Sequence, residues 1–132
     1  MTQTISKGIS QLRQEADNVI ETIQAEEAEE LLRAQKAILI DVRDQDERER
    51  NGVIPHSVHI PRGMLEFKID PSTPVSSRVF SEYEHFIFYC ATGWRSAFAA
   101  KTAHDMGISH TYNLKGGIAR WKEEGHQIES PI

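Results

Sequence analysis

The sequence has 132 residues, of which 39% are hydrophobic, a formal net charge of −5 and a single cysteine. This length predicts one domain with its own hydrophobic core, and the negative charge argues against a nucleic-acid-binding protein, which would need a basic face. One cysteine excludes an internal disulfide and a Cys-x-x-Cys site. If this cysteine is reactive, its reaction partner has to come from another molecule.

The N-terminal residues are polar. Residues 1–17 lack the apolar core of a signal peptide, and no run in the chain approaches the length of a membrane span. We therefore expect a cytoplasmic protein that does not contact membranes. Ile5, Ile9 and Leu12 recur at roughly helical spacing, so residues 1–18 are predicted to be an N-terminal extension, helical in part, that precedes a single domain over residues 19–132.

Along the chain, short β-branched or apolar runs alternate with segments of helical composition. Strands are expected at 19–23, 37–42, 58–61, 86–89 and 111–114, and helices at 24–36, 44–51, 62–67, 96–106 and 118–124. Such alternation predicts an α/β fold, with a central, mostly parallel sheet and helices on both of its faces. The glutamates in 26–30 are expected on a solvated helix face.

The cysteine, Cys90, ends the apolar run 86–89 and is followed by a loop containing Gly93 and then by a helical segment. In parallel α/β sheets, ligands bind beyond the carboxyl ends of the strands, where the next helix begins with unpaired N–H groups. A helix N-terminus and a nearby cation lower the pKa of a thiol, and Arg95 is such a cation. The pattern therefore favours a reactive thiolate over a buried structural cysteine.

Three further polar residues are expected at the same edge of the sheet. Asp41 and Arg43 stand at the end of the run 37–42, and Arg62 follows the strand expected at 58–61. For Arg62 two interpretations are open, which are a surface salt bridge to Glu66 at i,i+4 spacing and a role in binding an anion.

Taken in order, four groups of residues resemble the signature of single-domain rhodanese-like proteins, and the resemblance extends from about residue 19 to 127. They are Leu39-Ile40-Asp41-Val42-Arg43, Gly52-Val53-Ile54-Pro55 with His59-Ile60-Pro61, Tyr89-Cys90 with the loop to Ser96, and Leu114-Lys115-Gly116-Gly117 with Trp121 and Gly125.

The resemblance implies a sulfurtransferase. It makes Cys90 the nucleophile, which would carry a sulfane sulfur as a persulfide from a small anionic donor such as thiosulfate to an acceptor such as cyanide, a thiol or a protein. Arg95 would supply positive charge, Asp41 and Arg43 would brace the active edge, and neither a cofactor nor a metal is expected. The substrate-binding loop implied in this way consists of Ala91, Thr92, Gly93, Trp94, Arg95 and Ser96.

Two other functions stay open. A cysteine phosphatase or arsenate reductase also places a thiolate and an arginine in an anion-binding loop, but the tyrosine phosphatase signature has five residues between Cys and Arg. Only four separate Cys90 from Arg95, and the tighter ring of amides favours a single sulfur atom over a tetrahedral phosphate. Rhodanese-like domains also occur as non-catalytic binding or regulatory modules, although an intact Cys90 counts against this.

Overall fold

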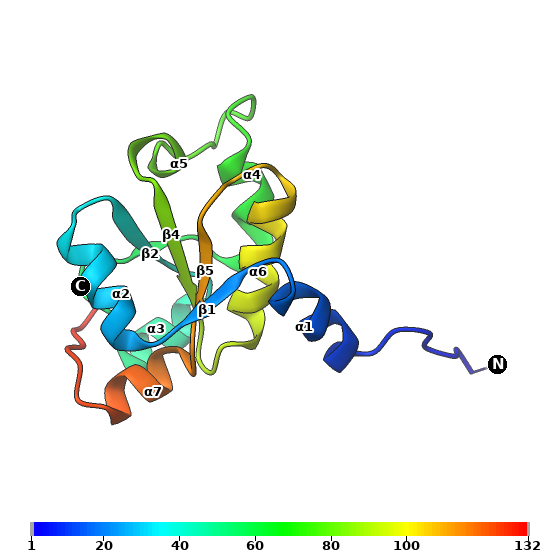
Figure 1. Cartoon of the computed structure of the whole chain (residues 1–132), viewed down its shortest axis with the longest axis horizontal. Coiled ribbons are helices and arrows are strands. Elements are labelled where there is room, and N and C mark those ends of the chain that lie inside the picture. The colour runs from blue at the N-terminus through cyan, green and yellow to red at the C-terminus, as the bar shows by residue number, and fades with distance from the viewer. Residues whose placement is uncertain (1, 132) are drawn as a thin grey trace.

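A computed structural model describes residues 2–131 of the chain (Figure 1). Its centre is a five-stranded sheet in the order β1-β5-β4-β2-β3, in which every pair of neighbouring strands is parallel. The expected mostly parallel sheet is therefore confirmed, with β4 in its centre and β1 at one edge. The strands are β1 (Glu21–Ile23), β2 (Ala37–Asp41), β3 (Val58–His59), β4 (His85–Tyr89) and β5 (Thr111–Leu114).

Helices cover both faces of this sheet, as expected for the predicted α/β class. In Figure 1, α1, α4 and α6 lie on one side of the sheet and α2 and α7 on the other. The helical elements are α1 (Ile9–Asp17), α2 (Ala25–Arg33), α3 (Gln45–Asn51), the 3₁₀ turn η1 (Arg62–Met64), α4 (Leu65–Ile69), α5 (Val79–Glu82), α6 (Trp94–Asp105) and α7 (Gly117–Glu123).

The alternation of side chains along β4 divides the core into two layers. Phe86 and Phe88 join the layer beneath α6, and Cys90, two residues after Phe88, lies on the same face. Ile87 and Tyr89 point the other way, into the layer beneath α2 and α7. The inner face of α6 presents small residues, which allow this helix to lie close to the strand that carries Cys90; these are Ala97, Ala99, Ala100 and Ala103.

The N-terminal segment contributes the helix α1, which packs against α6. Ala16 is fully buried in this contact. This helix packs through Ala16, whereas Ile9 and Leu12, whose spacing suggested a helix, are exposed. No helix within residues 2–131 is long and apolar enough to cross a lipid bilayer.

Several element boundaries differ from the prediction. The helix expected from residue 96 begins two residues earlier, because Gly93 takes a left-handed conformation (φ +101°) and lets the chain enter the helix at once. The helix expected to run to residue 36 ends at Arg33, and Gln35 follows it with φ +64°. The short helix α5 was not predicted, because a four-residue helix carries too little periodicity to be recognised.

Candidate active site

Cys90 is the first residue after β4 and begins the loop that leads into α6. Its side chain is almost completely buried, with 1% of the residue exposed. Three donors lie within hydrogen-bonding distance of its Sγ, which are the backbone N–H of Gly93 (3.2 Å), the backbone N–H of Ser96 (3.4 Å) and the hydroxyl of Ser96 (3.3 Å). The loop therefore surrounds one sulfur atom with donors.

These donors decide the ionisation of the thiol. Burial, the largest single influence, raises the pKa of Cys90, because an apolar environment disfavours the charged form. Hydrogen bonds from the Ser96 hydroxyl and from the backbone amides of Ser96, Gly93 and Thr92 act in the opposite direction and outweigh burial, so the pKa of Cys90 lies below its usual value. The hydrogen bonds of the loop therefore favour the thiolate form of Cys90.

Asn113, on the neighbouring strand β5, holds the loop in place. Its side-chain Nδ2 donates to the carbonyl oxygen of Gly93 (2.9 Å), and its Oδ1 accepts a hydrogen bond from the Ser96 hydroxyl (2.6 Å). Asn113 and Ser96 are both completely buried. The sequence analysis did not identify Asn113; the signal for it was an amide side chain inside a strand, β5, that is buried along its whole length, in register with Phe88 of β4.

The Gly116-Gly117 pair brings the start of α7 against the same loop. The first free amides of α7 donate to carbonyl oxygens of the loop, from Ile118 to Cys90 (3.0 Å) and from Ala119 to Ala91 (3.1 Å). Gly117 has φ +61°, and a Cβ atom there would lie 2.5 Å from the carbonyl oxygen of Cys90. Only glycine fits at this close approach of the two chain segments.

Arg95, the cation of the loop, is bound to Glu47 of α3. Two hydrogen bonds of 2.8 Å join the guanidinium to the carboxylate. The hydrogen bond from Arg95 lowers the pKa of Glu47 to about 2, and the bond to Glu47 raises the pKa of Arg95, with a smaller contribution from the Cys90 thiolate. Sequence analysis missed this role of Glu47 because the charged segment 44–51 has the composition of an ordinary exposed helix.

Asp41 and Arg43 form a buried ion pair at the end of β2. The Arg43 side chain donates to both carboxylate oxygens of Asp41, from Nε (3.0 Å) and from Nη2 (2.9 Å), and Nη2 also donates to the carbonyl oxygen of Gly52 (2.8 Å). The hydroxyl of Tyr89 donates to Asp41 as well (3.1 Å). These contacts join the ends of β2 and β4, and the bracing of the active edge by Asp41 and Arg43 stays a prediction.

The Arg62 side chain is directed along α6, away from its N-terminal end. Its guanidinium pairs with Glu66 (3.1 Å) and donates to the hydroxyl of Thr102 (3.0 Å). Thr102 lies six residues beyond Ser96, or about 9 Å along the helix. Of the two interpretations of Arg62, the salt bridge to Glu66 is the one found.

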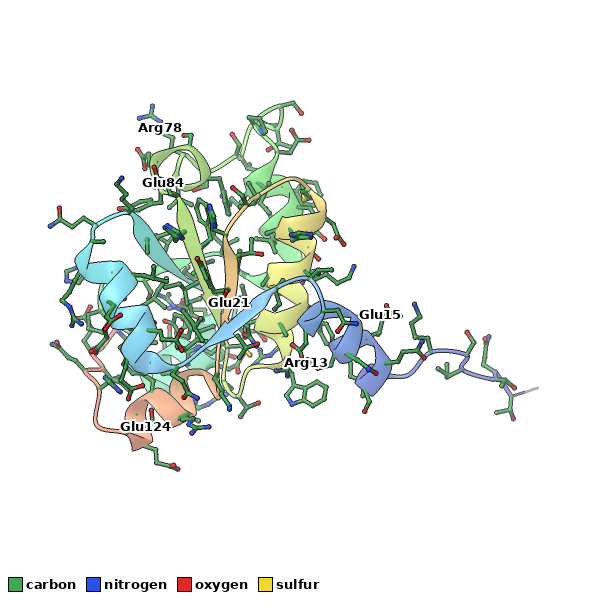
Figure 2. The ribbon with its side chains drawn as sticks, in the orientation of Figure 1. Arg13, Glu15, Glu21, Arg78, Glu84 and Glu124 are labelled. Atoms are coloured by element: carbon green, nitrogen blue, oxygen red, sulfur yellow. The ribbon has the colours of Figure 1, made fainter. Side chains whose placement is uncertain are left out.

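Trp94, the first residue of α6, contacts the N-terminal helix. The Arg13 guanidinium of α1 lies over the Trp94 ring, 5.0 Å from its centroid, and 42% of Trp94 is exposed. In Figure 2, Glu84, which directly precedes β4, lies in the upper part of the view, and Arg13 lies in the lower part. Arg13 is therefore at the edge of the sheet where the strand β4 ends and the cysteine loop begins.

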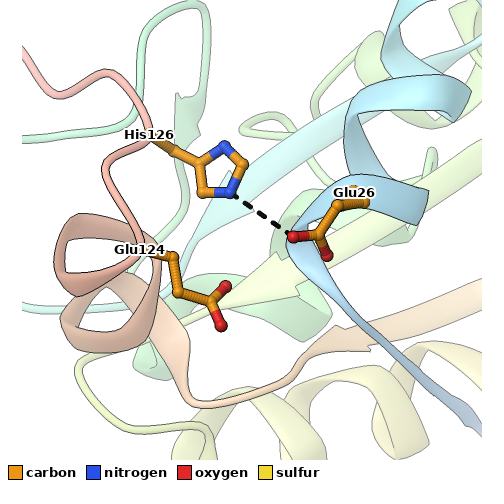
Figure 3. Close-up of side chains that lie close together, drawn as sticks. All are labelled: Glu26, Glu124 and His126. Atoms are coloured by element: carbon orange, nitrogen blue, oxygen red, sulfur yellow. Dashed lines mark ion pairs between the residues drawn. The ribbon is translucent and has the colours of Figure 1, made fainter.

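A second group of polar side chains joins α2 to the segment after α7 (Figure 3). One potential ligand atom each from Glu26, Glu124 and His126 lies within 4.8 Å of the others. His126 Nδ1 hydrogen-bonds to Glu29 (2.8 Å), and Glu124 pairs with Arg120 (3.2 Å). Both glutamates of the group are exposed, so we interpret it as surface ion pairing, in keeping with the solvated face predicted for 26–30.

The chain is similar to proteins of the rhodanese-like domain family. A model of the rhodanese-like domain matches residues 24–124. The putative sulfurtransferase YtwF of Bacillus subtilis is 33% identical over 86 residues, which is 65% of this chain and 74% of that protein. Thiosulfate sulfurtransferase GlpE of Coxiella burnetii is 30% identical over 99 residues, 73% of this chain and 81% of its own.

Among solved structures, RPA3614 from Rhodopseudomonas palustris superposes with a TM-score of 0.92 at 45% identity, covering 98% of this chain and 99% of that one. It is described as a protein of unknown function and a possible tyrosine phosphatase. Coverage of 98% includes the α1 segment, which lies outside the matched residues 24–124. The parallel sheet, the cysteine loop and the matched domain together establish that the chain belongs to the rhodanese-like domain family.

Proposed function

We propose that this protein is a sulfurtransferase that carries a sulfane sulfur as a persulfide on Cys90. The observation that carries the proposal is that three donors, two backbone amides and the Ser96 hydroxyl, lie within hydrogen-bonding distance of one sulfur atom, Cys90 Sγ, at the N-terminal end of α6. Membership of the rhodanese-like family and relatives that are named sulfurtransferases support the same chemistry.

In the first half of the reaction, thiosulfate is the proposed donor. The Cys90 thiolate attacks the outer sulfur of thiosulfate, a new S–S bond forms to Sγ, and the bond inside thiosulfate breaks. Sulfite leaves with the electron pair of that bond. The negative charge is then on the outer sulfur of the persulfide, and amides of a loop that point inward stabilise such an anion.

In the second half, an acceptor takes the outer sulfur. Cyanide or a thiolate attacks it, the S–S bond to Cys90 breaks, and the Cys90 thiolate is regenerated while thiocyanate or a new persulfide leaves. The chain has no second cysteine that could accept the sulfur, so the acceptor is a separate molecule. The low pKa of Cys90 makes it a good leaving group in this step.

Phosphatase activity is the alternative that the description of the Rhodopseudomonas palustris protein raises. Two features of the loop argue against it here. Only four residues separate Cys90 from Arg95, and both ends of the Arg95 fork are occupied by Glu47. A bidentate contact between Arg95 and a phosphate ester would first have to break the pair with Glu47.

The test is a turnover assay with thiosulfate and cyanide, run beside an assay with an aryl phosphate. We expect thiocyanate from the wild-type protein, none from Cys90→Ser, and no phosphate release from either. Phosphate release that depends on Cys90, without thiocyanate, would show that the alternative is correct. Inactivity in both assays, with several donors tried, would favour a non-catalytic binding module.

A further inference from the structure

The hydroxyl of Ser96 lies between two acceptors. It is 2.6 Å from Oδ1 of Asn113 and 3.3 Å from Sγ of Cys90. The orientation of the Asn113 amide is fixed, because the Gly93 carbonyl that it contacts can only accept a hydrogen bond, so the NH₂ group faces Gly93 and the oxygen faces Ser96. A hydroxyl has one proton and can donate to only one of its two neighbours.

The protonation state of Cys90 decides whether all three groups are satisfied. In the neutral state, the thiol S–H donates to the Ser96 oxygen, and the Ser96 hydroxyl donates to Asn113. When Cys90 ionises, its S–H is lost. The hydroxyl then either stays with Asn113 and turns its lone pairs toward the thiolate, or rotates to the thiolate and leaves Oδ1 of Asn113 without a donor.

Water does not resolve this competition. The exposed fraction is 0% for Ser96 and Asn113 and 1% for Cys90. A buried acceptor without a donor is costly because it has lost its hydration. Ionisation of Cys90 therefore costs one hydrogen bond that would not be lost if Asn113 were apolar.

We propose that Asn113 is a positioning residue that competes with Cys90 for the single proton of the Ser96 hydroxyl and thereby limits how readily Cys90 ionises. By competing for this proton, the Asn113 oxygen limits how far the thiolate is stabilised. A less stabilised thiolate is a stronger nucleophile, since nucleophilicity falls as the thiol pKa falls. Its amide group meanwhile holds the Gly93 end of the loop.

Other charged groups surround the loop. The hydrogen bonds of the Ser96 hydroxyl within residues 2–131 go to Cys90 and Asn113 and not to these groups. These groups are Arg95 on α6, Glu47 on α3 with Asp44 before it, Arg13 on α1, and the Asp41–Arg43 pair at the end of β2. Their influence on Cys90 is the same in every variant compared below, so it cancels in the comparison.

If the proposed function is correct, the same hydroxyl alternates during the reaction. It turns toward Sγ while Cys90 is a thiolate and returns to Asn113 once the outer sulfur of the persulfide carries the charge. This second statement rests on the proposed function, whereas the competition itself does not.

The experiment is a pH titration of the Cys90 thiolate by its ultraviolet absorbance, with Cys90→Ser as the blank. Cys90 is the one cysteine of the chain, so the signal has a single source. We expect Ser96→Ala to raise the pKa of Cys90 and Asn113→Leu to lower it, each by about half to one pH unit. Ser96→Thr keeps the hydroxyl and is expected to stay near the wild-type value.

The double variant separates this effect from simple loosening of the loop. Loss of the bond to Gly93 is common to both backgrounds, so Asn113→Leu is expected to lower the pKa in the wild-type background but not in the Ser96→Ala background. Equal shifts in the two backgrounds would overturn the proposal and leave Asn113 with a purely structural role. Because no sulfur donor is used, this result is independent of whether the protein transfers sulfur.

A second measurement needs no substitution at Asn113. In the wild-type protein, the NMR signals of the Asn113 side-chain amide are expected to shift with the same midpoint as the ionisation of Cys90. In Ser96→Ala this shift is expected to vanish. An Asn113 signal that titrates equally in both proteins, or in neither, would contradict the competition even if Asn113→Leu did not fold.

Discussion

Arg95 and Glu47 are joined by two parallel hydrogen bonds of 2.8 Å, which connect the first turn of α6 to the first turn of α3. The cation next to the candidate nucleophile is therefore paired within the protein. The negative charge of the Cys90 thiolate is stabilised mainly by N–H and O–H donors of the loop, and the charge of Arg95 contributes only in part.

This pairing gives a prediction for the binding of an anionic donor. We expect Arg95→Ala to raise the KM for thiosulfate by about three- to fivefold, the effect of roughly 1 kcal/mol, because it removes the positive charge beside the loop. Glu47→Gln breaks the same pair but leaves the charge of Arg95 free, so its KM is expected to be unchanged or lower. Steady-state kinetics of the two variants decide this, and an equal rise in KM for both would mean that the pair acts only by holding the loop.

The same pair makes stability depend on pH. The pKa of Glu47 is about 2 in the folded protein, below its usual value. Its contribution to stability is therefore complete above the unfolded pKa, near 4.5, and is lost as the pH falls toward 2. We expect Glu47→Gln to lower the free energy of unfolding at pH 7 by about 1 kcal/mol, since the partner Arg95 is partly exposed to solvent.

The measurement is urea denaturation of the wild-type protein and Glu47→Gln at pH 7 and pH 3. The difference between the two proteins is expected to be smaller at pH 3. A difference that is constant over this range would show that the carboxylate charge is not what stabilises the contact.

Gly117 is expected to be essential for the packing of α7 on the cysteine loop. A Cβ atom there would lie 2.5 Å from the carbonyl oxygen of Cys90 and 2.6 Å from that of Ala91. Gly125→Ala is the matched control, because Gly125 also has a positive φ (+86°) but has open space around it. We expect Gly125→Ala to lower the free energy of unfolding by about 1–2 kcal/mol. Gly117→Ala is expected to lower it by about 1–3 kcal/mol more, because of the steric overlap. Similar free energies of unfolding for the two variants would refute the close approach.

The buried Asp41–Arg43 pair is expected to serve stability. Both side chains are completely buried, so Arg43→Leu leaves the Asp41 charge without its main partner, at a cost of about 3–5 kcal/mol. Arg48 also contacts Asp41 (3.2 Å) but is partly exposed, and Arg48→Leu is expected to cost about 1 kcal/mol or less. Chemical denaturation measures both, and equal costs would argue against a special role of the buried pair.

The sequence predicted the features that depend on local pattern. The apolar run before Cys90, the glycine in the loop and the helical composition after it sufficed to place the thiol at the carboxyl end of a strand. The alternation of strands and helices likewise predicted the α/β class. These signals are local because strand burial and tight turns restrict the residue types at each position.

The contacts that support the loop could not be predicted in the same way. Asn113 lies 23 residues after Cys90, and Glu47 lies 43 residues before it. Each contacts the loop only because of tertiary packing. Glu47 has the appearance of a surface residue in a charged helix, and Asn113 is one polar residue in a short buried strand. Arg62 shows the opposite case, since its position after a strand suggested the active edge and its side chain is directed along α6.

The most direct test of sulfur transfer through Cys90 is the intact mass of the protein after incubation with thiosulfate and removal of excess donor. We predict that the wild-type protein gains the mass of one sulfur atom, that Cys90→Ser gains none, and that cyanide returns the wild-type mass to its original value. A wild-type protein that gains no sulfur from thiosulfate, or a Cys90→Ser variant that gains as much, would contradict a persulfide on Cys90.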